Sequence, residues 1–249
     1  MYTEFENNKE SICNDLLILA ELLNEHDLCK DTKSLYSASN FRYNTDINNW
    51  KYNVSIPITV NSIPSHIRPI DTEFLEINFS IEIEGTFVEE MNVENCLLDL
   101  KFDILISGLT NEGLNIATWH LDKHVGCDDD GESKFTHPEY HFSFGGNKMW
   151  EQNLDCGGIL LHPSPRIPHP PMDAILGVDF ILQNFIDRKD IFKLLNTPEY
   201  KNIVRNSQIR LWRPYMLATA SHWCNYGGCG LNGKVELASK YYSTLENFN

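Results

Sequence analysis

Two segments of the chain alternate apolar and polar residues over a length that predicts half-buried β-strands. Residues 75–84 carry Leu, Ile or Phe at every odd position and Glu, Asn or Ser at every even position. Residues 98–106 carry Leu, Phe or Ile at even positions, so Leu98 is expected to face the core. Successive side chains of a strand point to opposite faces. The short connection between the segments favours antiparallel neighbours in a sheet with one face in water.

Further strands are indicated on both sides of this pair. Residues 52–60 form a strand candidate that Pro57 confines to a sheet edge, because proline has no N–H to donate to a neighbour. Residues 116–124 and 139–146 continue the series, and residues 157–162 are a further candidate. The prolines of the following segment, 163–171, predict an extended connection.

Segments with helical periodicity lie before and after the predicted strands. Residues 9–29 predict an amphipathic helix, residues 31–50 predict turns, and a helix is expected to open near Pro171. The helical region beyond it is expected to break near Pro198 and Pro214. The prediction is one compact α+β domain over residues 1–249. It has an N-terminal helix 9–29, an antiparallel β-meander of about four to six strands spanning about 52–162, and a C-terminal helical region 171–223, with the helices packed on one face.

The amino-acid composition restricts which class of protein this chain can be and in which compartment it works. With 42% hydrophobic residues the chain can bury a core, and 35 acidic against 20 basic residues give a net charge of −15. That charge repels nucleic acid and anionic membranes. The seven cysteines form no tight framework, the N-terminus is acidic, and no apolar run is long enough to cross a bilayer. These features predict a cytoplasmic protein that does not insert into membranes.

Charge is distributed unevenly along the chain. Residues 71–103 carry ten acids and one base, whereas residues 187–213 carry seven bases and three acids. One interpretation is two solvated faces. The other is that the basic patch 188–213 meets an acidic partner, or the acidic strand face of a second copy. This patch is also the only candidate for direct contact with nucleic acid, which the overall charge disfavours.

A histidine-rich stretch, residues 119–146, holds the main candidate site. On its first strand His120, Asp122 and His124 share one face, and on its second strand His141 shares a face with Ser143. If the aromatic residues of both strands join the core, these polar faces coincide. Such a cluster suits acid–base catalysis or a divalent metal such as zinc or manganese.

Strand geometry limits the ligand set. Residues four apart on a strand are separated by roughly 13 Å, so His120 and His124 cannot share one tetrahedral ion on a flat strand. The candidate sets are therefore His120, Asp122 and His141, or Asp122, His124 and His137. A remaining ligand would come from one of four residues: Asp128, Asp129, Asp130 and His162. The alternative is exposed histidines on a wet sheet face.

Two further candidates lie in the second half of the chain. Arg166 stands between prolines, where a stiff backbone would present its guanidinium to a carboxylate or a phosphate in a catalytic role, or to a structural partner on the sheet. His222, Cys224 and Cys229 have spacing compatible with three zinc ligands, which Cys127 or Cys156 would have to complete. The alternative is idle thiols beside a glycine turn.

The chain has a predicted helix, then four predicted strands, then the proline-rich segment "PRIPHPPMDAILGVDF". It also contains the pair His137-Pro138 and, further on, Cys156. This layout, over about residues 70–200, resembles ubiquitin-conjugating enzymes and related RWD-type domains. The resemblance implies that Cys156 would be the catalytic cysteine beyond a His-Pro-Asn triplet. Glu139 stands where that triplet has asparagine, and Cys156 lies further along the chain than is usual in the family.

Three functions follow from these observations. The leading hypothesis is a cytoplasmic partner-binding subunit of a multi-protein system, such as one of bacterial host defence or of a mobile element. The first alternative is a metal-dependent hydrolase centred on His120, Asp122 and His141. The second is a conjugation-like fold that uses Cys156.

Overall fold

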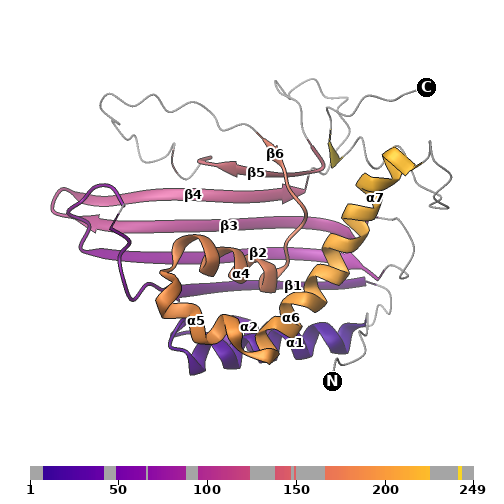
Figure 1. The fold of residues 1–249 in the computed structure, drawn as a ribbon, viewed down its shortest axis with the longest axis horizontal. Helices are drawn as coiled ribbons and strands as arrows, with labels where there is room; N and C mark the ends of the chain where they lie inside the picture. Colours follow the sequence, from indigo (N-terminus) through magenta and orange to yellow (C-terminus); the bar gives the residue numbers. More distant parts are fainter. Residues whose placement is uncertain are drawn as a thin grey trace.

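The computed structural model describes residues 8–41, 49–65, 67–87, 95–123, 138–146, 149, 166–224 and 241–242. Six strands form one sheet in which every neighbouring pair is antiparallel and the spatial order follows the chain (Figure 1). They are β1 (Asn49–Thr59), β2 (Phe74–Thr86), β3 (Leu97–Thr110), β4 (Gly113–Lys123), β5 (Tyr140–Phe144) and β6 (Ile167–Pro168). The predicted α+β meander is confirmed. The strand expected at 157–162 lies outside the described residues.

The sheet has an inner face, which packs against helices, and an outer face, which is turned away from them. The alternation predicted for β2 is confirmed, since Leu75, Ile77, Phe79, Ile81 and Ile83 are all buried. Strands β1, β3, β4 and β5 add further apolar side chains to the same core. Burial of this face is the main source of stability for the fold.

Strand β1 is a sheet edge, as Pro57 predicted. Part of this edge is covered. Ser34 Oγ donates to Ser55 O at 2.7 Å and accepts from Ser55 N at 3.2 Å, and Thr59 N donates to Leu28 O at 2.8 Å. Backbone groups that would otherwise be open to another chain are therefore paired within the molecule.

A bulge between β2 and β3 changes the alternation expected at the start of β3. Glu84 pairs with Asp99, but Gly85 pairs with Leu97, so one extra residue enters β3. Leu97 then takes the buried position and Leu98 is exposed, contrary to the prediction for Leu98. A Cβ at Gly85 would lie 2.4 Å from Trp50 Cζ2, so only glycine lets this indole pack against the bulge.

Helix α4 (Ala174–Phe185) packs directly on the sheet. Asp173 caps it, accepting from the N–H groups of Ile175 at 3.1 Å and Leu176 at 3.0 Å. A Cβ at Gly177 would lie 2.6 Å from both Phe79 Cζ and Phe102 Cε2. This glycine therefore sets how closely the helix approaches the inner face.

The helices that follow are α5 (Arg188–Asn196), α6 (Pro198–Ser207), a π-helical segment η3 (Gln208–Trp212) and α7 (Arg213–Cys224). The break predicted near Pro198 is confirmed, because α6 begins there. The break predicted near Pro214 is wrong, since Pro214 lies in the first turn of α7. The π-helical turn before it, in which Arg213 N donates to Gln208 O, rearranges the hydrogen bonding where proline provides no N–H.

At the N-terminus, α1 (Lys9–Glu25) is shorter than the predicted helix 9–29, and Asp27 beyond its end has a φ of 54°. A second helix, α2 (Lys33–Ala38), replaces part of the turns predicted over 31–50 and packs beside β1. Helices α4 and α7 cross in front of the strands in Figure 1, whereas α6 lies with α1 and α2 along the β1 side. Within the described residues, no helix has both the length and the apolar character needed to span a membrane.

Candidate functional site on the outer sheet face

The described members of the polar set predicted to share a face of β4 and β5 do so, and His124 lies outside the described residues. Asp122 lies directly opposite His141, and His120 lies opposite Ser143. On the far side of β4, His120 is opposite Asp103 of β3. Leu121 and Phe142 join the core, which leaves the polar residues on the outer face. The predicted coincidence of the two polar faces is confirmed.

Within this cluster the imidazole and carboxylate are close. His120 Nε2 lies 3.7 Å from Asp122 Oδ2, and both side chains are partly exposed. Burial raises the pKa of Asp122, and the carboxylate of Asp103 adds to the rise, while His120 opposes it. His141 is buried, with Nδ1 3.3 Å from Pro138 O. The backbone at Gly146 lies so close that a Cβ there would approach His120 Cε1 to 3.2 Å.

This arrangement places a carboxyl and an imidazole, both partly exposed, 3.7 Å apart, and such a pair can exchange a proton with a bound group. Among the described residues, no group of three or more His, Cys, Asp and Glu side chains is arranged to hold a metal ion. The other proposed ligands lie outside the described residues: His124, Asp128, Asp129, Asp130, His137 and His162.

The candidates in the second half of the chain lie elsewhere. Arg166 is half-buried and directly precedes β6, whose Pro168 pairs with His141, and burial lowers the pKa of its guanidinium. His222 is buried in α7, with its ring 4.9 Å from that of Trp223. The Cys224 side chain and residues Cys127, Cys156 and Cys229 lie outside what the structure describes, so the zinc and conjugation hypotheses stay predictions.

An exposed apolar row crosses one end of the outer face. Phe74, Leu109 and Leu114 are 56%, 48% and 58% exposed. Phe74 pairs with Leu109 across β2 and β3, and Leu109 pairs with Leu114 across β3 and β4. Side chains opposite one another on adjacent strands lie close enough to form one surface. We refer to these three residues as the apolar row.

Carboxylates lie along the same face beyond the apolar row. They are Glu76, Glu82, Glu84, Asp99, Asp103 and Asp122, at positions that alternate with the buried residues of β2, β3 and β4. Two lysines lie among them, with Lys51 Nζ 2.8 Å from Glu84 Oε2 and Lys101 Nζ 3.8 Å from Glu82 Oε2. Carboxylates still outnumber lysines, so the outer face has an apolar end and is acidic along the rest of its length.

The helical layer presents the opposite charge. Five residues of α5 and α6 make what we call the basic helix surface: Arg188, Lys189, Lys193, Lys201 and Arg205. All five are exposed, and Phe192, which is 57% exposed, lies among them on α5. Arg210 belongs to the predicted basic patch by sequence, but it is buried and does not contribute to this surface.

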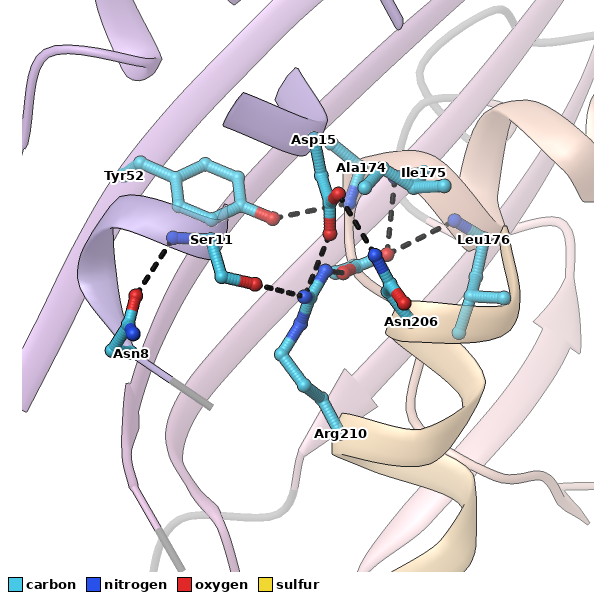
Figure 2. Close-up of polar contacts among 10 residues, drawn as sticks. Asn8, Ser11, Asp15, Tyr52, Ala174, Ile175, Leu176, Asn206 and Arg210 are labelled. Atoms are coloured by element: carbon cyan, nitrogen blue, oxygen red, sulfur yellow. Dashed lines mark hydrogen bonds and ion pairs between the residues drawn. The ribbon is translucent and has the colours of Figure 1, made fainter. Parts of the chain in front are cut away.

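Arg210 is instead the centre of a buried polar cluster that joins distant parts of the chain (Figure 2). Its Nη1 atom donates to Asp15 Oδ2 of α1 at 2.7 Å, and Nη2 lies 3.8 Å from Asp173 Oδ2. Asn206 Nδ2 donates to Asp15 Oδ1 at 3.1 Å. Burial raises the pKa of Asp15, and the Arg210 guanidinium opposes this rise. The cluster fixes α1 against α4 and η3.

Sequence reasoning missed both the buried cluster and the apolar row. A signal for the first was present, because Asp15 falls three residues after Ile12 and four before Leu19, on the apolar side of its helix. The apolar row could have been found from the outer-face alternation, which places Leu109 and Leu114 in phase with acidic and polar residues. Nothing in the spacing identifies Arg210 as buried.

Comparison of the chain with protein-family models, with curated proteins and with solved structures finds no match.

Proposed function

We propose that the chain is a partner-binding subunit of a multi-protein assembly and that the outer face of its sheet is the binding surface. The observation that carries the proposal is the apolar row. Phe74, Leu109 and Leu114 are each about half exposed or more and lie next to one another on three adjacent strands. Adjacent exposed apolar side chains surrounded by polar residues are typical of protein interaction sites.

The charges around the row indicate the chemistry of the partner. Glu76 lies two residues from Phe74 on β2, and the remaining carboxylates continue along the same face. A complementary partner surface presents apolar side chains to the row and Lys or Arg side chains to the acids. The acidic field would also speed the approach of such a surface.

A cytoplasmic setting is part of this proposal. Two thiols, Cys29 and Cys96, are buried, and burial raises the pKa of each. Protonated buried thiols resist oxidation and suit a reducing compartment.

The proposal is tested by affinity purification of the full chain from its native cells with quantitative mass spectrometry. We expect the Leu109→Ser/Leu114→Ser variant to lose a stoichiometric partner that the wild-type chain retains. The matched control is Ile167→Ser on β6, which removes an equally exposed apolar side chain away from the row. A partner bound equally by all three proteins would contradict the assignment of the surface.

The metal-dependent hydrolase remains a second candidate because Asp122 and His141 are opposite one another. Isothermal titration of zinc or manganese into purified protein tests it. Binding of about one ion per chain that His120→Ala and Asp122→Asn abolish, and that His26→Ala leaves intact, would support this candidate. Absence of binding to the wild-type chain would exclude it.

A further inference from the structure

We infer that the partner of the outer face is a second copy of this chain, which docks with its basic helix surface. This inference rests on the proposed function and names the occupant of the same surface. It is drawn from the complementarity of two surfaces on one molecule. Each surface carries what the other lacks.

The first element of the complementarity is charge. The outer face carries six carboxylates and two lysines, and both lysines are already paired with glutamates of that face. The basic helix surface carries five Lys and Arg side chains against three acids on or next to the same helices, Asp187, Asp190 and Glu199, and Asp187 is paired with Lys189, one of the five, at 3.2 Å. Two copies of the chain can therefore oppose an acidic surface to a basic one despite the net charge of −15.

The second element is apolar. The apolar row on the outer face has a counterpart in Phe192, which projects among Arg188, Lys189 and Lys193 on α5. Exposed aromatic side chains flanked by Arg and Lys are enriched at the centres of protein interfaces. An aromatic residue seated among Phe74, Leu109 and Leu114 would bury apolar area on both copies.

The third element is geometry. The outer face is turned away from the helices, whereas α5 and α6 pack against each other and α6 packs against α1 and α4, so the two surfaces lie on different parts of the molecule (Figure 1). Two different surfaces on one molecule make a heterologous, head-to-tail contact, in which each bound copy still offers one free surface of each kind. Assembly then proceeds beyond a dimer unless it closes into a ring.

Sedimentation velocity of the purified full chain tests the inference. The wild-type mass is expected to rise above 28.7 kDa with concentration and to fall back when sodium chloride is raised from about 50 mM to about 500 mM, because salt screens surface charges. Reversing the sheet charges with Glu76→Lys/Glu82→Lys, or the helix charges with Arg188→Glu/Lys193→Glu, is expected to weaken association at least about tenfold.

A chain that carries all four reversals has complementary surfaces again and is expected to recover association, which a misfolded variant could not do. A wild-type chain that stays monomeric throughout overturns the inference, as does association that ignores the helix reversal. The two proposals can also be separated. If the wild-type chain is monomeric but Leu109→Ser/Leu114→Ser loses a different protein partner, the proposed function is supported and only the second copy is excluded as the partner.

Discussion

The guanidinium of Arg210 and the carboxylate of Asp15 are joined at 2.7 Å, although 195 positions separate them in the chain. Both side chains are almost fully buried. Burial of a charge is costly unless it is paired, so each of these residues depends on the other. The pair lies where α1 meets the helices that follow the sheet (Figure 2), and Asp173, the N-cap of α4, lies 3.8 Å from the guanidinium.

Replacing Arg210 with alanine is expected to lower the free energy of unfolding by about 3–5 kcal/mol, since it leaves two buried carboxylates without their cation. Urea denaturation followed by circular dichroism measures the change. Arg188→Ala, at an exposed position on α5, serves as the control and is expected to cost less than about 0.5 kcal/mol. A loss below about 1 kcal/mol for Arg210→Ala would show that the cluster is not a structural clamp.

Gly177→Ala is expected to destabilise the fold by about 1–3 kcal/mol, although alanine is normally the better helix residue. The added methyl group would lie 2.6 Å from two aromatic rings of the inner face, so α4 would have to move outward. Thermal and urea unfolding measure the effect. The double variant Gly177→Ala/Phe102→Leu should recover part of the loss, and simple additivity of the two changes would contradict the clash.

The raised pKa of Asp122 predicts a pH-dependent contribution to stability. A carboxyl whose pKa is higher in the folded state than its ordinary value of 3.8 stabilises the fold below that value, and this contribution is lost as the pH rises through the raised pKa. The unfolding free energy of the wild type minus that of Asp122→Asn should therefore fall over this window and then become constant.

Asp187 provides a control, because its pKa is shifted in the opposite direction to that of Asp122. Its pKa is lowered by the hydrogen bond from Lys189 N, so its contribution is present above 3.8 and is lost as the pH falls through the lowered pKa. Urea unfolding at a series of pH values, with carbon-13 NMR of the carboxyl groups, compares the two. Equal pH slopes for Asp122→Asn and Asp187→Asn would contradict the assignment.

Ser34→Ala is expected to uncover the edge of β1. The hydroxyl occupies both the N–H and the carbonyl of Ser55, so its loss opens two backbone groups to another strand. We expect a stability loss of about 0.5–1.5 kcal/mol and faster aggregation on mild heating, measured by light scattering. Ser37→Ala on the same helix is the control. Identical aggregation rates for the two variants would show that Ser34 does not protect the edge.

Much of the sheet could be predicted because strand periodicity is a local property. The inward set of β2, the edge position of Pro57 and the common face of Asp122 and His141 all follow from alternation and chain order. The error at Leu98 comes from the bulge, which lies where Trp50 of another strand packs against Gly85. Such a contact does not change the alternation of apolar and polar residues, so the pattern in the sequence does not reveal it.

The surfaces were harder to predict. Charge runs indicated an acidic and a basic region, but they could not separate Arg210, which is buried, from Arg205, which is exposed. That difference arises from the π-helical turn and from α1 packing against α6. The candidate site shows the same limit. The sequence indicated that His120 and Asp122 share one face, but it did not indicate how deeply Asp122 is buried, and that burial raises the pKa of its carboxyl.

The chain order of the sheet has a consequence for how the protein folds. Each of the first four strands pairs with the strand that follows it, so each pairing is closed by the chain between consecutive strands, which is only two residues long between β3 and β4. Residues 8–25 meet their partners on α6 and η3 only after nearly the whole chain is available. During synthesis the sheet can therefore form hairpin by hairpin and α1 can pack against α2, whereas the side of α1 that meets α6 and η3 stays uncovered until those helices are made. We expect its docking to be the last step of folding, and Arg210→Ala to speed unfolding more than it slows refolding.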